Sequence, residues 1–226
     1  VNSPGGTVDE SDELYLKLME YKEKTKRPGY AYFGSQACSG AYYISMAADK
    51  IYTNRNTWTG SIGVIVSLTN YKKLYDKLGI KEIDITSGKN KSMGSGGLDL
   101  TDEQYDILQS LVDEAYDQFA GIVSEGRGID IATVKKIADG RIYSAKQAKE
   151  KKLVDEIGTE DELKTLIQKE NKLSDDVVYD TAKSSGSNFL SNLMGSVQKI
   201  MPKSDSELAV DIIENKGKGV LMYYAD

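Results

Sequence analysis

Histidine is absent from the 226 residues, cysteine and tryptophan occur once each, and proline occurs three times. Without histidine the chain cannot build a Ser-His-Asp triad. A single cysteine excludes an intramolecular disulfide framework, and neither a Cys-x-x-Cys pair nor a histidine cluster is present to indicate a metal site. No stretch reaches the roughly 18 consecutive apolar residues that a membrane-spanning helix needs. Any catalysis by this chain must therefore rest on other residue types.

Charge and motif content narrow the function class further. The net charge is −6 and the isoelectric point is near 5.0, which argues against a nucleic-acid partner. No phosphate-binding Gly-x-x-x-x-Gly-Lys-Ser/Thr loop occurs, so nothing indicates ATP or another cofactor. The length suits one α/β domain with a large buried core.

Ser39 lies between small residues in the run Ala37–Tyr43 and opens an apolar segment. This pattern is typical of a nucleophile on a tight turn into a helix. Because histidine is absent, its base would have to be a lysine, a carboxylate or a terminal amine. The same small residues also let a helix pack closely on a sheet, so the motif alone leaves a structural role open. Cys38 is an alternative nucleophile, although buried cysteine is common as a small apolar filler.

A second glycine turn, Pro4-Gly5-Gly6, opens the chain. Thr7 and Glu10 form a capping-box pattern, which predicts a helix over Asp9–Lys24. A glycine turn that leads into a helix presents backbone N–H groups, and such a site suits an anion, including an oxyanion. An ordinary capped loop is the alternative.

The order of predicted elements indicates an α/β fold. An extended stretch, Gly29–Gly34, follows the first helix, and this βαβ-type alternation places both glycine turns at the carboxyl ends of strands. Further strands are predicted over Ser61–Val66 and Lys81–Thr86. The remaining helices are predicted from apolar periodicity and capping residues over Tyr71–Leu78, Thr101–Ser124, Asp130–Asp139, Ser144–Lys151 and Thr159–Gln168.

We expect two parts in the chain. Residues 1–182 form the catalytic domain, and residues 183–226 form a helical extension with a linker over 183–188 and a tail. Apolar residues between Phe189 and Met201 share one helical face. We expect this face to pack against the domain or another subunit, with adsorption to a membrane surface as the alternative.

Several motifs together resemble signal peptide peptidase A, a family of bacterial membrane-anchored Ser-Lys peptidases related in fold to the Clp protease and crotonase superfamily. The resemblance covers roughly residues 1–160 and rests on Asn2–Gly6, Cys38–Ile44, Ala47–Tyr52, Thr59–Val64, Gly126–Gly128, Ala138–Arg141 and Val154–Gly158. It implies a Clp/crotonase-like open sheet with repeated β-β-α and βαβ units and flanking helices.

The resemblance also implies a role for each site residue. Ser39 matches the nucleophile, Lys91 the general base, and Ser61 a serine that orients the lysine amine. The backbone N–H groups of Gly6 and Gly40 match the oxyanion hole. A lysine base needs its pKa lowered from about 10.4 to about 7–8, and burial away from carboxylates supplies such a shift.

The surroundings of Lys91 fit that requirement, because Gly88–Gly97 contains no acidic residue. Lys89 lies in the same segment and is a rival base. An ordinary solvated loop is the alternative for both lysines.

The function that follows from the resemblance is a membrane-associated serine endopeptidase that degrades cleaved signal peptides and other hydrophobic peptides. A short form must bring Ser39 and Lys91 together from neighbouring copies, so we expect a ring-like homo-oligomer with shared active sites. Val1 stands directly before the catalytic turn. We therefore expect upstream strands and, by resemblance, an N-terminal membrane anchor, with the catalytic domain on the extracytoplasmic side of the cell membrane. A crotonase-like acyl-CoA enzyme and a catalytically silent scaffold of peptidase fold are the other candidates.

Overall fold

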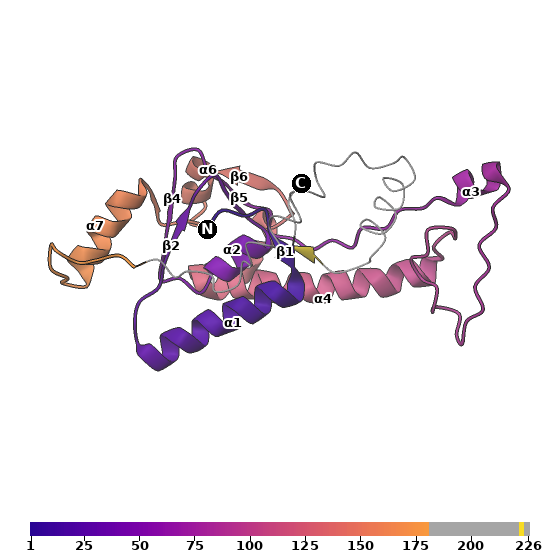
Figure 1. The fold of residues 1–226 in the computed structure, drawn as a ribbon, viewed down its shortest axis with the longest axis horizontal. Helices are drawn as coiled ribbons and strands as arrows, with labels where there is room; N and C mark the ends of the chain where they lie inside the picture. Colours follow the sequence, from indigo (N-terminus) through magenta and orange to yellow (C-terminus); the bar gives the residue numbers. More distant parts are fainter. Residues whose placement is uncertain (181–221, 224–226) are drawn as a thin grey trace, which may run out of the picture.

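The computed structural model describes residues 1–180 and 222–223 (Figure 1). The helices in this part of the chain are α1 (Val8–Thr25), α2 (Gly40–Ser45), α3 (Lys72–Leu78), α4 (Asp102–Arg127), α5 (Ile131–Ile137), α6 (Ala145–Glu150) and α7 (Glu160–Glu170). The strands are β1 (Gly6–Thr7), β2 (Tyr30–Phe33), β3 (Gln36–Cys38), β4 (Lys50–Thr53), β5 (Trp58–Gly60), β6 (Ile142–Ser144), β7 (Glu156–Ile157) and β8 (Met222–Tyr223).

Parallel strand pairs form the centre of the molecule. One sheet has the order β2-β4-β7 with both pairings parallel, and another has the order β3-β5-β6 with β3 and β5 parallel. The chain passes through α2 between β2 and β4, and also between β3 and β5, as parallel pairing requires a crossover. The predicted α/β fold class is confirmed.

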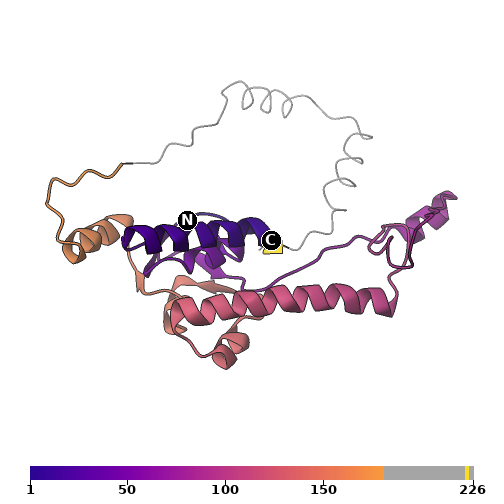
Figure 2. The same ribbon diagram turned by 90° about the horizontal axis from the view of Figure 1, so that it is seen from below.

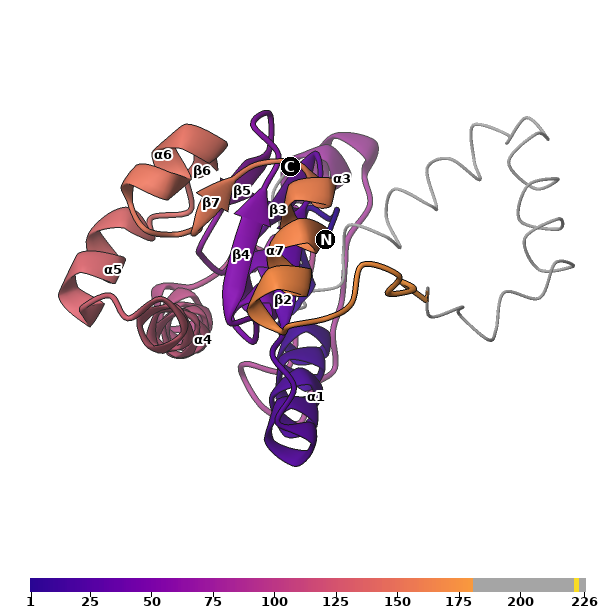
Figure 3. The same ribbon diagram turned by 90° about the vertical axis from the view of Figure 1, so that its left-hand side faces the viewer.

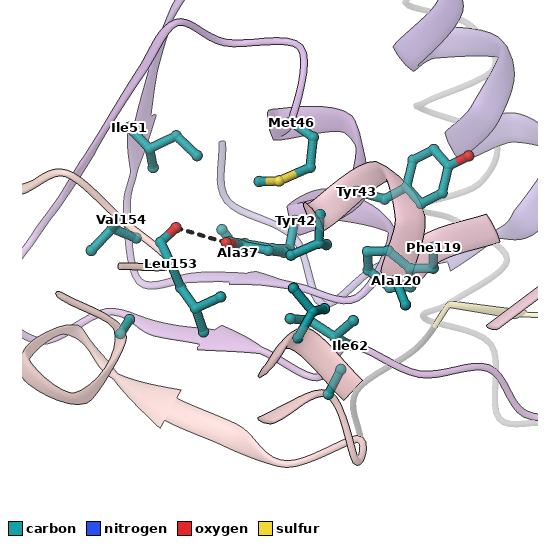
Figure 4. Close-up of a cluster of buried hydrophobic side chains, with 14 of the residues drawn as sticks. Ala37, Tyr42, Tyr43, Met46, Ile51, Ile62, Phe119, Ala120, Leu153 and Val154 are labelled. Carbon is teal, nitrogen blue, oxygen red and sulfur yellow. Dashed lines mark hydrogen bonds between the residues drawn. The ribbon is translucent and has the colours of Figure 1, made fainter. Parts of the chain in front are cut away.

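Helices lie on both sides of these strands. Figure 3 shows α1 and α7 on one side, and α4, α5 and α6 on the other. The short helix α2 is the most buried element, and Tyr42 and Tyr43 have no exposed surface (Figure 4). Each buried side chain of this size contributes about 1.5–3 kcal/mol through removal of apolar surface from water. The core is therefore built around the helix that follows Ser39.

The predicted helix boundaries agree with the structure where capping residues mark them. Reciprocal capping boxes are present at Thr101 with Gln104, Ser144 with Gln147, and Thr159 with Glu162, all as predicted. At the start of α1 the box is incomplete. Thr7 Oγ1 accepts the N–H of Glu10, but the Glu10 carboxylate accepts from the Thr7 hydroxyl instead of from the backbone.

Two predicted strands are wrong. The segment Ser61–Val66 does not form a strand; β5 ends just before it at Gly60, because Gly60 (φ 87°) and Ser61 (φ 47°) both leave the extended region. The segment Lys81–Thr86 forms no strand. Ile85 is 99% exposed, so this segment lacks the neighbouring strand that would stabilise an extended conformation.

The segment from α3 to the start of α4 projects beyond the sheet as an arm (Figures 1 and 2). The C-terminal half of α4 contributes most of its core residues, with Ala115, Phe119 and Val123 buried, whereas Tyr105 near its start is 59% exposed. We define the arm as residues 66–111. It carries several exposed apolar side chains, namely Leu74, Leu78, Ile80, Ile83, Ile85, Tyr105 and Leu111.

The predicted linker at 183–188 and the predicted helix at 189–201 lie outside the described residues. Within residues 1–180 and 222–223, none of the helices combines the length and the hydropathy needed to cross a membrane.

An ion pair between the buried Arg127 and the partly exposed Asp155 joins α4 to the sheet. Arg127 Nη1 and Nη2 donate to both oxygens of Asp155 at 3.0 and 2.8 Å, and the Ile51 N–H donates to the same carboxylate at 2.7 Å. Burial of Asp155 opposes its ionisation, but the hydrogen bonds from Arg127 and Ile51 outweigh burial and hold the pKa of Asp155 below its ordinary value. This carboxylate therefore stabilises the fold in its ionised form.

We expect Asp155→Ala to lower the free energy of unfolding by about 2–3 kcal/mol, because it leaves the Arg127 guanidinium buried without its partner. The neighbouring Glu156 pairs with Lys149 on the surface, so Glu156→Ala is the matched control and should change stability little. Since the folded pKa of Asp155 is depressed, its contribution is present above the unfolded value of about 3.9 and is lost as pH falls through the folded value. Chemical denaturation at pH 7 and near pH 3 measures both effects, and equal losses for the two variants at pH 7 would contradict this account.

Candidate active site

Ser39 occupies a sharp turn between β3 and α2. Its φ of 54° and ψ of −121° are unusual for a residue with a side chain, and such a conformation costs on the order of 1–3 kcal/mol. Two hydrogen bonds hold it: the Ser39 N–H donates to Gly60 O at 2.8 Å, and Ser39 O accepts from the Tyr43 N–H at 2.9 Å. A strained strand-to-helix turn of this kind is how several hydrolases present a nucleophilic serine.

The hydroxyl of Ser39 is buried and has no hydrogen-bond partner among the described residues. Ser39 as a whole is 1% exposed. An unpartnered buried hydroxyl lowers the stability of a fold by about 1–3 kcal/mol, so its presence in a native structure requires an explanation. A nucleophilic serine whose base comes from another polypeptide segment is one such explanation, because its hydroxyl has no partner until that segment is in place.

Ser61 lies at the end of the strand next to Ser39. Strands β3 and β5 run parallel with Cys38 opposite Gly60, so the two serines follow the same ends of paired strands. The Ser61 N–H donates to Arg141 O at 2.9 Å, and Ser61 is 6% exposed. The structure therefore places the predicted nucleophile and the predicted orienting serine together at the carboxyl ends of a parallel pair, where α/β sheets hold their sites.

The two predicted oxyanion donors belong to neighbouring elements. Ser3 pairs in parallel with Ala37, which brings the glycine turn that follows Ser3 toward the end of β3. Gly5 has a φ of 129°, a conformation that glycine adopts readily, and β1 contacts α2. Gly40 is the first residue of α2, so its N–H has no partner within the helix.

Lys91 lies on the arm, in a loop held against the start of α4. Its neighbour Lys89 pairs with Glu103, near the start of α4, at 2.7 Å. The contact between α2 and α4 lies farther along α4, where Gln118 Nε2 donates to Tyr43 Oη at 2.8 Å. A helix rises about 1.5 Å per residue, so the stretch from Glu103 to Gln118 spans roughly 22 Å. A single copy therefore does not bring Lys91 beside Ser39.

Cys38 is a poor nucleophile in this setting. Burial raises the pKa of its thiol to about 11, and Sγ lies 3.5 Å from Trp58 O. A thiol with such a pKa is protonated near neutral pH, and only the thiolate attacks a carbonyl well. The structure therefore favours Ser39 over Cys38.

Two features around this site were not predicted from the sequence. The first is the antiparallel pairing of β1 with β8, with Gly6 opposite Tyr223, which no local pattern could reveal. The second is the hydrogen bonding of the Tyr43 hydroxyl. Its only signal in the sequence is the presence of aromatic residues just after the Ser39 turn. In the part of the chain that the structure describes, no group of three or more carboxylate or thiol side chains is arranged to hold a metal ion.

Comparison with known proteins identifies the family to which this chain belongs. The profile of peptidase family S49 matches residues 21–174, which include the Ser39 turn, Ser61 and the arm. The chain belongs to peptidase family S49.

Three relatives of this S49 chain, two from bacteria and one from a plant, show the extent of the similarity. It is 42% identical over 195 residues to a protein of Enterococcus faecium that is provisionally named signal peptide peptidase SppA, and the match covers 86% of this chain and 56% of that protein. It is 34% identical over 181 residues to Protease 4 of Haemophilus influenzae, covering 80% and 29% of the two chains. It is 30% identical over 159 residues to the chloroplastic serine protease SPPA of Arabidopsis thaliana, covering 70% and 23%. The S49 chain thus spans little more than half of the first relative and less of the others.

Among solved structures, the S49 chain is similar to a mutant of ClpP1 from Listeria monocytogenes. The TM-score is 0.46 at 18% sequence identity, and the match covers 72% of this chain and 74% of that one.

Proposed function

We propose that this chain is a serine endopeptidase in which Ser39 is the nucleophile and Lys91 of a neighbouring copy is the general base. The observation that carries the proposal is the buried, unpartnered hydroxyl of Ser39 on a strained strand-to-helix turn. Such strain persists where the surrounding structure enforces it, and it concentrates at active sites. Membership of a peptidase family supplies the reaction class.

The mechanism uses the chain's own groups in two half-reactions. Ser39 Oγ attacks the scissile carbonyl while the lysine amine takes its proton, and the N–H groups of Gly6 and Gly40 bind the oxyanion of the tetrahedral intermediate. The lysine then returns the proton to the leaving amine, and the C–N bond breaks to leave an ester on Ser39. Water hydrolyses this ester with the lysine again acting as base. Ser61 holds the amine in the orientation that both steps need.

The pairing of β1 with β8 supports a mode of substrate binding. The edge of β1 accepts an extended segment in antiparallel register directly at Gly6. A peptide that adds a strand at this edge would pass its backbone across the oxyanion donors. Binding through the main chain suits a peptidase that cleaves unfolded or extended peptides.

The arm supports a homo-oligomer with shared sites. Its exposed apolar residues include Leu78 at 63% and Ile83 at 74%, and exposed apolar surface of this kind marks contacts with another protein. Contact with a second copy would bury the arm and bring its lysine to a neighbouring Ser39.

Hydrophobic peptides such as cleaved signal peptides are the proposed substrates, with the domain on the extracytoplasmic side of the cell membrane. The name of the Enterococcus faecium relative supports this substrate class. The acyl-CoA enzyme and the silent scaffold are the competing functions, and neither would cleave peptides.

The test is cleavage of a fluorogenic hydrophobic peptide together with labelling by a serine-reactive fluorophosphonate. We expect Ser39→Ala to abolish both while leaving the melting temperature equal or higher, because Ser39 Oγ makes no hydrogen bond among the described residues. Ser45→Ala is the matched control. Ser45, the last residue of α2, is also a buried serine, but its hydroxyl donates to Ala41 O at 2.7 Å. We therefore expect Ser45→Ala to lower the melting temperature and to keep activity. Cleavage that survives Ser39→Ala would refute the proposed nucleophile.

A further inference from the structure

The two oxyanion donors of the proposed mechanism come from different elements of the fold, and this inference rests on that mechanism. Gly6 lies in β1 and is joined to the start of α1 by Thr7, and Gly40 is the first residue of α2. An oxyanion hole works only if its donors lie about 2.7–3.1 Å from one developing charge, so their separation must be held closely. Contacts between α1 and α2 therefore help to determine the geometry of the hole, together with the pairing of Ser3 with Ala37.

Tyr43 makes that junction. It lies one turn after Ser39 on α2, and its side chain has no exposed surface. Its hydroxyl donates to Asp12 Oδ1 in the second turn of α1, and accepts from Gln118 Nε2 of α4 at 2.8 Å.

Aromatic packing holds the ring of Tyr43 in the same position. The ring of Tyr15, also on α1, meets it edge-on with centroids 5.6 Å apart. The ring of Phe119 on α4 lies 5.1 Å away on a tilted plane. Both contacts come from the helices that hold the hydroxyl, so the side chain of Tyr43 is fixed at both its ring and its oxygen.

We infer that Tyr43 is a positioning residue for catalysis, which sets the distance between the Gly6 and Gly40 donors through its hydrogen bond to Asp12. The backbone of Tyr43 also donates to Ser39 O at 2.9 Å, so the same residue touches the nucleophile's own turn. Loss of the hydroxyl would let α1 shift relative to α2. A misplacement of about 1 Å in such a constellation costs on the order of a hundredfold in rate.

Tyr42 provides a matched control on the same helix. It is equally buried, and its hydroxyl donates to Leu153 O at 2.7 Å (Figure 4). Leu153 lies in the loop between α6 and β7, which carries neither oxyanion donor. Removal of the Tyr42 hydroxyl takes one hydrogen bond from the core and removal of the Tyr43 hydroxyl takes two, but only the bond from Tyr43 to Asp12 joins α1 to α2.

The experiment compares Tyr43→Phe with Tyr42→Phe in the full chain. Tyr42→Phe should lower the melting temperature by about 2–4 °C, and Tyr43→Phe by up to about twice as much. Tyr43→Phe should lower kcat for a fluorogenic hydrophobic peptide roughly tenfold to a hundredfold with KM within about threefold, because the oxyanion contact forms only in the transition state. Tyr42→Phe should keep kcat within about twofold of wild type.

Two variants of Asp12 complete the test and cover the case in which Tyr43→Phe does not fold. Asp12→Ala removes the acceptor and should lower kcat as Tyr43→Phe does. Asp12→Asn keeps an acceptor oxygen and should restore most of kcat, which a general loss of stability would not produce. If Tyr43→Phe and Asp12→Ala both behave like Tyr42→Phe while Ser39→Ala is inactive, the positioning role is wrong and the serine mechanism stands. If the wild-type chain has no activity that Ser39→Ala removes, the proposed function itself fails.

Discussion

Replacement of Lys91 by alanine or by arginine is expected to lower peptide cleavage by at least about a thousandfold, because each change removes the general base. Arginine keeps the length and charge of the side chain, but its guanidinium is effectively never deprotonated in proteins and cannot accept the proton of Ser39. A lysine that served only as a positive charge would be replaced well by arginine. Steady-state cleavage of a hydrophobic fluorogenic peptide measures the difference.

The matched control for this prediction is Lys89→Ala. Lys89 lies in the same loop, is exposed, and pairs with Glu103 on the surface. Surface pairs of this kind contribute little, so we expect Lys89→Ala to retain activity within roughly threefold and to fold normally. Lys91 is also exposed in a single copy, so neither change should unfold the chain. Near-wild-type cleavage by Lys91→Ala, or equal losses for the two lysines, would eliminate Lys91 as the base.

Local patterns predicted most of the helices because helix ends depend on neighbouring residues. Ser144 and Gln147, for example, form a reciprocal capping box that is fully encoded within four positions of the sequence. The same holds for Gly79, whose left-handed conformation ends α3 as predicted. Such features need no knowledge of the rest of the fold.

Strands were predicted less well because a strand exists only beside a partner. The alternating segment Lys81–Thr86 has the right pattern, but in the structure Ile83 and Ile85 face solvent with no strand next to them. The pairing of β1 with β8 joins residues at opposite ends of the chain, and nothing in either segment indicates the other. Both outcomes depend on the arrangement of the whole chain.

The candidate site likewise combines features that the local sequence predicts with features that depend on the whole fold. Ser39 and Gly40 lie on the strand-to-helix turn that their small neighbours predict, whereas Ser61 follows β5 and does not open the predicted strand. The contact between Tyr43 and Asp12 depends on how two helices pack, and no spacing in the sequence specifies it. The position of Lys91 depends on a long projecting arm, which the predicted strand in that region did not suggest.

Mixed oligomers of two inactive variants should recover activity if the site is shared between copies. Ser39→Ala chains supply an intact lysine, and Lys91→Ala chains supply an intact serine. The distance along α4 favours a shared site, since the arm loop lies roughly 22 Å from the region of the helix that contacts α2. In a closed ring each copy would offer its arm to the next, and random mixing of equal amounts would restore about a quarter of the sites.

The experiment co-expresses the two variants with different affinity tags and purifies through both, so that only mixed oligomers are assayed. A chain that carries both substitutions, mixed with either single variant, is the control and should stay inactive, since no interface then unites an intact serine with an intact lysine. Activity from the first mixture alone would establish that Ser39 and Lys91 act across an interface between subunits. If doubly tagged mixed oligomers of the two single variants remain inactive, the two residues act within one subunit, and the arm of each copy must fold back along its own α4 to reach Ser39.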